Sequence, residues 1–246
     1  MSLHSQSVAQ GTSEQVRIVR TFKRFTLGQR WEHVALMATS AVLLLTGLPQ
    51  KYRATAWSQQ ILATPERVEL IQDIHHIAAV LLTLEVLYHL VNAIILMSRR
   101  QLPAAIFPSN KDLVDFWKMV KYLLFLSDQK PSYGKYNFEQ KFTYWFLAFA
   151  IAIMVISGFI LWFPLFFTKF LPGGIIPAAK FAHSSEAIAA AIFIILWHFY
   201  HVHLERLNLS IFTGTINEED IQEHHPLEYQ RLTAEMHKNE NPGEKE

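Results

Sequence analysis

Four long apolar segments restrict what this chain can fold into. They are residues 31–48, 74–97, 143–164 and 183–204. Each approaches or exceeds the roughly 20 residues that a helix needs to cross the hydrocarbon core of a membrane. Only 17% of the 246 residues are charged, against about 25% in soluble domains. Backbone groups in lipid must be bonded within the protein. The sequence therefore predicts an all-α integral membrane four-helix bundle.

The positions of Lys and Arg predict the orientation of this bundle. Five precede the first span, eight lie between the second and third, and four follow the fourth, whereas the loops at residues 50–71 and 165–180 hold three and two. The positive-inside rule then places both termini in the cytoplasm. Residues 1–30, without a signal-peptide core, are expected to be an uncleaved tail, and residues 205–246 a second tail. Between spans two and three, residues 107–125 predict an amphipathic helix on the membrane surface.

The composition excludes several kinds of chemistry. The chain has no cysteine, so disulfides, iron–sulfur ligation and covalent attachment of c-type haem are excluded. Its formal net charge is +1, and no basic run interleaved with aromatic residues suggests nucleic-acid binding. Phosphate-binding loops and hydrolase motifs are also missing. A bound metal must therefore be held by His, carboxylate or Met.

Histidines occur in the spans at two depths. His33 opens span one at the inner, cytoplasmic side. His75 and His89 lie 14 residues apart in span two, and His183 and His198 lie 15 apart in span four. On a helix these spacings correspond to roughly 21–22 Å along the axis and offsets of about 40° and 60°, so each pair shares one face. Such helices can hold two planar cofactors, and the cofactor with an imidazole on each side is bis-histidine haem b.

Small residues and additional histidines lie close to these two layers. Gly47 and Gly158 leave room at the outer layer, where the edge of a porphyrin could approach. His76 is expected to face away from its neighbour His75. His201 and His203 lie at the water boundary, either as solvated or headgroup-contacting residues or as parts of a proton path or quinone contact.

Charged residues within or beside the spans have two interpretations each. Intramembrane carboxylates are functional candidates by default, so Glu85 and Glu186 either transfer protons or bond a neighbouring helix. Arg24 and Arg30, near His33, either pair with propionates of an inner haem or mark the positive-inside boundary.

Several motifs together suggest a known family. They are "QRWEH" and "LLLTG" in span one, "DIHHIAAV" in span two, "YGKYNFEQK" before span three, "ISGFILWFP" within it, "AHSSEAIAAAIFIILWHFYHVH" in span four and "HHPLEYQRL" near the C-terminus. On these motifs the sequence resembles the membrane cytochrome b subunits of respiratory formate dehydrogenases. More distantly, it resembles the b-type cytochromes of nickel–iron hydrogenases and thiosulfate reductase. The resemblance covers about residues 24–231.

The resemblance implies which histidines hold the haems. It implies an outer haem between His75 and His183 and an inner haem between His33 and His198. His89 is additional to this pattern and lies at the inner layer, so it is the alternative partner of His198. The 15-residue spacing in span four is one longer than the resemblance implies. This difference predicts either a one-residue bulge in the helix or a rotated ring.

The resemblance also implies a quinone site. Asn137 and Gln140, with Lys141 adjacent, match the part of the family pattern that borders a menaquinone on the cytoplasmic side. An amide pair can hydrogen-bond a quinone carbonyl. The same pattern implies an electron-transfer subunit of an oxidoreductase complex rather than a complete enzyme.

The sequence therefore predicts a multi-pass dihaem cytochrome b in the lipid of a bacterial or archaeal cytoplasmic (inner) membrane. It is expected to pass electrons between a periplasmic iron–sulfur or multihaem c-type subunit, docked on residues 50–71 and 165–180, and menaquinone or another quinone. Two other function classes stay open. One is a transporter that conducts protons or ions along the buried carboxylates and histidines, and the other is a passive anchor for a periplasmic enzyme.

Overall fold

The computed structural model describes residues 20–101, 104–204 and 207–240, so most of the expected N-terminal tail lies outside it. The helices and strands are β1 (Thr21–Lys23), α1 (Leu27–Lys51), α2 (Ala56–Ile61), α3 (Pro65–Ser98), η1 (Ala104–Ile106), α4 (Asn110–Leu123), α5 (Phe138–Trp162), α6 (Pro164–Phe167), α7 (Ile175–Phe193), η2 (Ile194–His198), η3 (Tyr200–Leu204), α8 (Ser210–Thr213), β2 (Thr215–Asn217), α9 (Glu218–His224) and α10 (Pro226–Glu240). Two of them, η2 and η3, are π-helical and continue α7.

Four helices are long and apolar enough to cross a membrane. They are Leu27–Lys51, Pro65–Ser98, Phe138–Trp162 and Ile175–Val202, which confirms the predicted mostly helical chain with four helices able to span a membrane. Each helix begins before its apolar stretch. Thr26, Thr64 and Asn137 accept hydrogen bonds from the first turns of α1, α3 and α5, because side-chain caps satisfy N–H groups that the helix leaves unpaired. Hydropathy detects only the apolar stretch, so the predicted spans begin later than the helices, which include these polar first turns.

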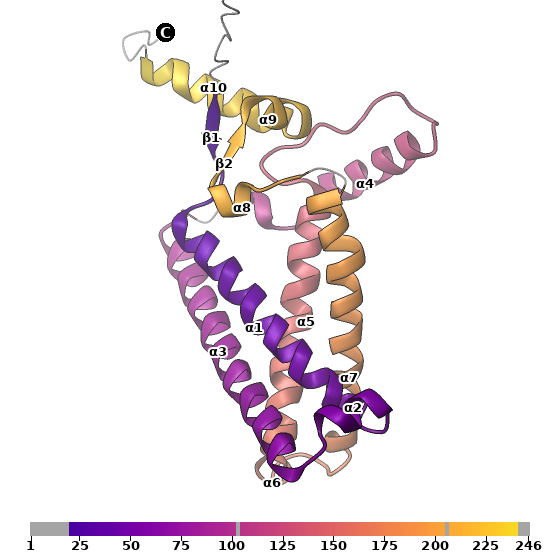
Figure 1. Ribbon diagram of the computed structural model, residues 1–246. Coiled ribbons are helices and arrows are strands. Elements are labelled where there is room, and N and C mark those ends of the chain that lie inside the picture. The colour runs from indigo at the N-terminus through magenta and orange to yellow at the C-terminus, as the bar shows by residue number, and fades with distance from the viewer. Residues whose placement is uncertain (1–19, 102–103, 205–206, 241–246) are drawn as a thin grey trace, which may run out of the picture.

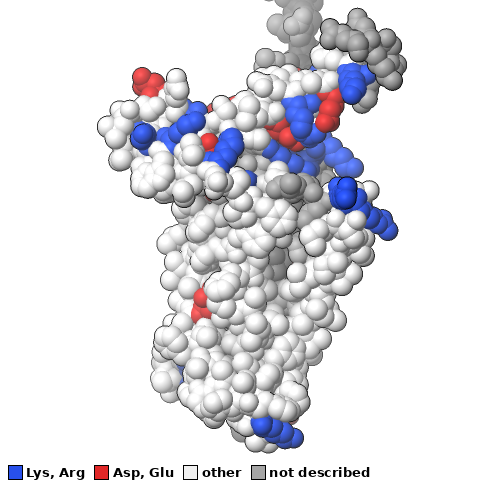
Figure 2. Space-filling view, turned by 180° about the vertical axis from the view of Figure 1, so that it is seen from behind, with Lys and Arg blue, Asp and Glu red and all other residues white. Residues whose placement is uncertain are grey.

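The four helices form two hairpins. α1 packs along α3 and α5 along α7, and the hairpins contact each other through α1 and α7. Figure 1 shows α2 and α6 at one end of the bundle, which we call the open end, and β1, β2, α9 and α10 at the other, which we call the capped end. At most 17% of any spanning window is buried inside the protein. Figure 2 shows an almost uncharged shaft with Lys and Arg gathered mainly at the capped end, as contact with lipid requires.

The capped end is a small folded unit made from both ends of the described chain. β1 and β2 pair antiparallel, with Phe22 opposite Ile216. These two side chains and Ile221 form a buried cluster, against which Tyr229 and Met236 pack. Sequence reasoning treated these segments as tails, because strands of three residues leave no readable alternation of polar and apolar positions.

Candidate functional site

The first pair of histidines lies between α3 and α7 toward the open end. The rings of His75 and His183 have centroids 6.3 Å apart and planes inclined by 71°. Two imidazoles that bind one metal from opposite sides, with nitrogen–metal distances of about 2 Å, have ring centres roughly 6 Å apart. The spacing therefore fits a single metal ion between the rings. We call His75 and His183 the outer pair.

A hydroxyl group on the neighbouring helix holds each ring of the outer pair. Thr46 Oγ1 on α1 lies 2.8 Å from Nδ1 of His75, and Ser157 Oγ on α5 lies 3.1 Å from Nδ1 of His183. Nδ1 of His183 also lies 3.2 Å from the Met154 carbonyl, which can only accept, so this nitrogen carries the hydrogen. A bond of this kind fixes the tautomer and leaves Nε2 as the ligand atom.

The two hydroxyl groups use their own protons within their helices. Thr46 donates to the Val42 carbonyl at 2.7 Å, and Ser157 donates to the Ile153 carbonyl at 2.6 Å. Each oxygen is therefore available to accept from an imidazole N–H. The outer site thus consists of two equivalent halves, one from each hairpin.

A glycine follows each hydroxyl residue and lies against the same ring. A Cβ on Gly47 would be 3.3 Å from Cε1 of His75, and a Cβ on Gly158 would be 3.2 Å from Cε1 of His183. Sequence reasoning gave this room to the edge of a porphyrin, whereas in the structure the imidazole occupies it. The Thr-Gly and Ser-Gly pairs at matching places in spans one and three were the sequence signal for these half-sites.

The second pair of histidines lies near the capped end. The rings of His33 on α1 and His198 on η2 have centroids 6.3 Å apart and planes inclined by 42°, and the ring of Phe212 meets His33 edge-on at 6.3 Å. Trp197 donates to the Thr143 hydroxyl at 3.0 Å, which fixes the turn that carries His198. We call His33 and His198 the inner pair.

The predicted bulge in span four is present. η2 is a π-helical turn in which the N–H of Phe199 bonds the carbonyl of Ile194, five residues earlier. A π-turn inserts one residue into an α-helix without changing the helix on either side. The 15 residues from His183 to His198 therefore advance about as far as 14 would in a regular helix. The extra residue keeps both histidines on one face.

His89 lies apart from the inner pair and contacts α1 and α5 instead. Its Nδ1 is 2.7 Å from Glu32 Oε2 on α1, and its Nε2 is 3.1 Å from the Tyr144 hydroxyl on α5. Both ring nitrogens therefore contact protein groups. The inner layer thus contains a histidine pair and, separately, a carboxylate–histidine–tyrosine chain.

The residues suggested for a quinone site gather at the start of α5. Asn137 caps the helix by accepting from the Gln140 N–H at 2.8 Å, and Gln140 Oε1 accepts from the Asn137 N–H at 3.3 Å. Lys141 is buried and donates to Asp112 at 2.8 Å. Burial acts to raise the pKa of Asp112, but hydrogen bonds from Lys141 and Ser109 more than offset it and lower the pKa. The three predicted residues therefore lie together and also have structural roles.

Sequence reasoning missed a buried polar network that connects this site to the capped end. His225 is almost fully buried, with Nδ1 2.7 Å from the Gly134 carbonyl and Nε2 3.1 Å from Arg24 Nη2. The same Arg24 nitrogen donates to Gln140 at 3.5 Å. Burial raises the pKa of Tyr136, which lies in the loop between Gly134 and the start of α5. The "HHPLEYQRL" motif contains His225, but its contacts with residues so distant in sequence are a property of the fold.

The remaining candidates lie at varied positions. His76 stacks on Trp162 with centroids 4.1 Å apart and planes 9° apart, facing away from the outer pair. His201 packs against Trp197 at 4.5 Å. Glu85 has a buried oxygen, Oε2, and Arg30 donates to the Phe212 carbonyl. Glu186 is half-buried, and the side chain of His203 lies outside the described part.

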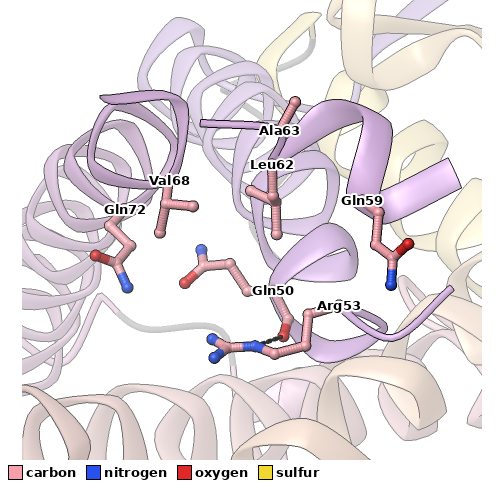
Figure 3. Close-up of a pocket in the computed structure, with 7 residues that line it drawn as sticks. All are labelled: Gln50, Arg53, Gln59, Leu62, Ala63, Val68 and Gln72. Carbon is pink, nitrogen blue, oxygen red and sulfur yellow. Dashed lines mark hydrogen bonds between the residues drawn. The ribbon is translucent and has the colours of Figure 1, made fainter. Parts of the chain in front are cut away.

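The open end holds a cavity of about 390 Å³ between α1, α2 and α3. Its lining residues are Gln50, Arg53, Gln59, Leu62, Ala63, Val68 and Gln72. Figure 3 shows the side chains of Gln50, Gln72 and Arg53 directed toward one another, with Nε of Arg53 bonded to the Gln50 carbonyl. Three amide side chains, three apolar side chains and one cation line this cavity, which lies beyond the outer pair along α1 and α3.

Comparison with known proteins agrees with a haem-binding bundle. The sequence profile described as prokaryotic cytochrome b561 matches residues 24–214. The cytochrome b556(fdo) subunit of formate dehydrogenase from Escherichia coli strain K12 is 24% identical over 215 residues, which cover 86% of this chain and 93% of that subunit. The cytochrome b556(Fdn) subunit of the nitrate-inducible formate dehydrogenase from the same strain is 25% identical over 126 residues, covering 51% and 57%.

Proposed function

We propose a function for this chain on the basis that it belongs to the prokaryotic cytochrome b561 family. We propose that it binds two b-type haems, one at the outer pair and one at the inner pair. The observation that carries this proposal is the equal 6.3 Å separation of the rings in both pairs, because two imidazoles on one iron require about this distance. Each haem would supply reversible one-electron transfer.

The residues around the rings suit this role. Thr46 and Ser157 hold the Nδ1 atoms of the outer pair, so the Nε2 atoms would be the ones to bind a haem iron. Gly47 and Gly158 let the helices approach the rings closely. For the inner haem we propose His33 rather than His89 as the partner of His198, because the contacts of His89 with Glu32 and Tyr144 leave neither of its nitrogens directed at a metal.

We propose that the capped end lies in the cytoplasm of a bacterial cell. Lys and Arg favour the cytoplasmic side of a membrane protein, and Figure 2 shows them concentrated at that end. α4 then lies along the cytoplasmic surface of the membrane. Exposed apolar side chains such as those of Leu113 and Trp117 would contact lipid there, while its lysines remain in the headgroup region.

A quinone site is proposed at the start of α5, beside the inner pair. Capping uses Oε1 of Gln140 and Oδ1 of Asn137, and the Asn137 amide nitrogen donates to Glu139 at 3.2 Å. The Gln140 amide N–H groups and the second N–H of Asn137 would then be the donors that a quinone carbonyl needs. Lys141, paired with Asp112, keeps the helix start in place. The chain would thus exchange electrons with menaquinone or another quinone near the cytoplasmic surface.

The open end is the proposed docking face for a periplasmic redox subunit. The two curated relatives named above are subunits of formate dehydrogenases, and we propose that this chain likewise works in a respiratory complex. Side chains at the tip of the second hairpin, Leu165, Phe166 and Phe170, are more than half exposed, as expected of a surface that a partner covers. The cavity around Arg53 would receive a polar or acidic group of that partner.

The test of this function is a dithionite-reduced minus oxidised spectrum of the purified protein, with haem quantified per chain as its pyridine adduct. Two b-type haems per chain are expected. A folded protein without haem would overturn the proposal and favour the transporter or anchor class. One haem per chain would refute the two-layer arrangement.

A further inference from the structure

A chain of hydrogen-bonded side chains connects three helices at the level of the inner pair. Glu32 on α1 contacts Nδ1 of His89 on α3 at 2.7 Å, and Nε2 of His89 contacts the Tyr144 hydroxyl on α5 at 3.1 Å. We propose that His89 and Tyr144 form a proton relay that serves the quinone site, with Glu32 as the positioning residue. This inference rests on the proposed function, because the relay delivers protons to that quinone site.

The position of Tyr144 links the relay to the quinone site. Gln140 precedes it by one helical turn on α5, which places the two residues about 6 Å apart on one face. Its neighbour Thr143 accepts from Trp197 at 3.0 Å, and Trp197 directly precedes His198. Tyr144 therefore lies at the level of the inner pair, between His89 and the amide side chains that would bind a quinone.

The two nitrogens of His89 have different roles. Glu32 Oε2 lies 2.7 Å from Nδ1 of His89, and an N–H at Nδ1 donating to this oxygen would fix the hydrogen there. Nε2 is then the atom that gains or loses a proton. The His89 side chain is 44% exposed and that of Glu32 is 16% exposed, so His89 lies at the surface of the bundle while Glu32 is shielded within it.

The charged and titratable groups around His89 come from each helix packed against it. Glu32 faces it from α1 and Tyr144 from α5, and Glu85 lies one turn earlier on α3, close enough to interact electrostatically with both Glu32 and His89. When His89 carries two protons, the Glu32 carboxylate is in direct contact with the resulting imidazolium. The charge formed during transfer therefore has a counter-ion, as a charge inside a membrane requires.

During quinone reduction the relay would move one proton in each passage. A quinone would take two protons and two electrons, and the inner haem, when bound, would supply the electrons. For one proton, the Tyr144 hydroxyl gives its hydrogen to a quinone oxygen while the phenol oxygen takes the hydrogen from Nε2 of protonated His89. This leaves an intact phenol and a neutral imidazole, which is protonated again from the cytoplasmic side. A second passage of the relay then delivers the second proton. Quinol oxidation runs the same steps in reverse.

The test uses the full-length protein with its haems bound, in lipid vesicles that contain menaquinone-4. The variants are His89→Ala and Tyr144→Phe, and the matched control is His76→Ala, a histidine on the same helix that stacks on Trp162 at the opposite end. The measurements are haem content per chain and the rate at which menaquinone-4 reoxidises the dithionite-reduced protein.

We expect His89→Ala and Tyr144→Phe to keep both haems and to slow reoxidation by at least about tenfold, because a positioned proton donor contributes roughly 10²–10⁴-fold. Imidazole added to His89→Ala should restore much of the rate, which a purely structural role of His89 does not explain. His76→Ala should react like the unchanged protein.

Three outcomes would overturn the relay. Loss of one haem in His89→Ala would make His89 a haem ligand. Rates within twofold of the unchanged protein in both variants would show that protons take another path. A slowed His89→Ala protein that imidazole does not restore would make His89 structural. If the unchanged protein binds both haems but is not reoxidised by menaquinone-4, the quinone site fails instead, and the relay fails with it.

Discussion

The outer and inner histidine pairs have the same ring separation but very different surroundings. Each ring of the outer pair rests on a glycine and bonds a hydroxyl from its own hairpin, so the site has two equivalent halves. The inner pair lies beside a π-turn, an aromatic ring and the polar capped end. A symmetric site suits a group that only passes electrons. The asymmetric inner site, which adjoins titratable side chains and solvent, suits electron transfer coupled to protons.

The test of this comparison with the largest expected effect removes one proposed ligand from each layer. We expect His75→Ala and His33→Ala each to lower the haem content from two per chain to one, because one imidazole no longer holds the iron. The haem that remains should differ in spectrum and potential between the two variants. The pyridine adduct and a redox titration measure both. If His33→Ala keeps two haems, the inner ligand has been assigned to the wrong residue.

A side chain added at a glycine of the outer site should lower the haem content almost as strongly. In Gly158→Val the new Cβ would lie 3.2 Å from Cε1 of His183, and its methyl groups need additional space that a packed helix pair does not have. We expect most of the outer haem to be lost while the inner haem is kept, as measured by haem content and redox titration.

Gly173→Val is the matched control for that substitution, because a Cβ at Gly173 meets no atom within 4 Å. It should retain both haems. Equal behaviour of Gly158→Val and Gly173→Val would show that close approach of the ring to α5 is not needed.

Removing the Thr46 hydroxyl should shift the midpoint potential of the outer haem while the haem stays bound. In Thr46→Val the shape is kept, but Nδ1 of His75 loses an acceptor that makes the imidazole a stronger electron donor. The outer midpoint potential should therefore rise. One hydrogen bond is worth about 1 kcal/mol, which corresponds to roughly 40 mV for one electron. A redox titration should show no shift of the inner haem.

Thr83→Val provides the control for the hydroxyl. Thr83 bonds a carbonyl of its own helix at 2.7 Å, as Thr46 does, so its replacement tests the loss of such a bond alone. Matching shifts in the two variants would refute a specific effect on His75.

The smallest expected effect concerns pH at the capped end. The hydrogen bond from Arg231 lowers the pKa of Glu228, so this carboxylate stabilises the fold above its usual pKa of about 4.3. The contribution is lost as the pH falls below that value toward the lowered pKa. Because Arg231 is half exposed, the loss should be below about 1 kcal/mol.

The protection of α10 amides against hydrogen exchange, expressed relative to the intrinsic rate at each pH, should therefore fall slightly at pH 4 compared with pH 7, while the protection of the helices around the outer pair stays unchanged. Arg231→Gln should reduce this difference. An equal acid response in α10 and around the outer pair would mean that the capped end is no more sensitive to pH than the membrane shaft.

Much of this protein could be predicted from short-range patterns in the sequence. Apolar length determined the four spans, because a backbone in lipid must satisfy its own hydrogen bonds. The 15-residue spacing of His183 and His198, one longer than the family resemblance implies, predicted either a bulge in the helix or a rotated ring. The structure contains the bulge, at Ile194–His198. Helical periodicity placed His75 and His183 at one depth, and rise per residue does not depend on the partner helix.

Only the tertiary structure decided how these elements combine. The sequence left His33 and His89 as alternatives at the same depth, and the packing of α1 against α7 brings His33 next to His198 while His89 meets Glu32 and Tyr144. The contact between Arg24 and His225 joins residues about 200 positions apart. Depth along a helix follows from counting residues, but the partner that a side chain meets depends on how helices rotate and pack, which no local pattern encodes.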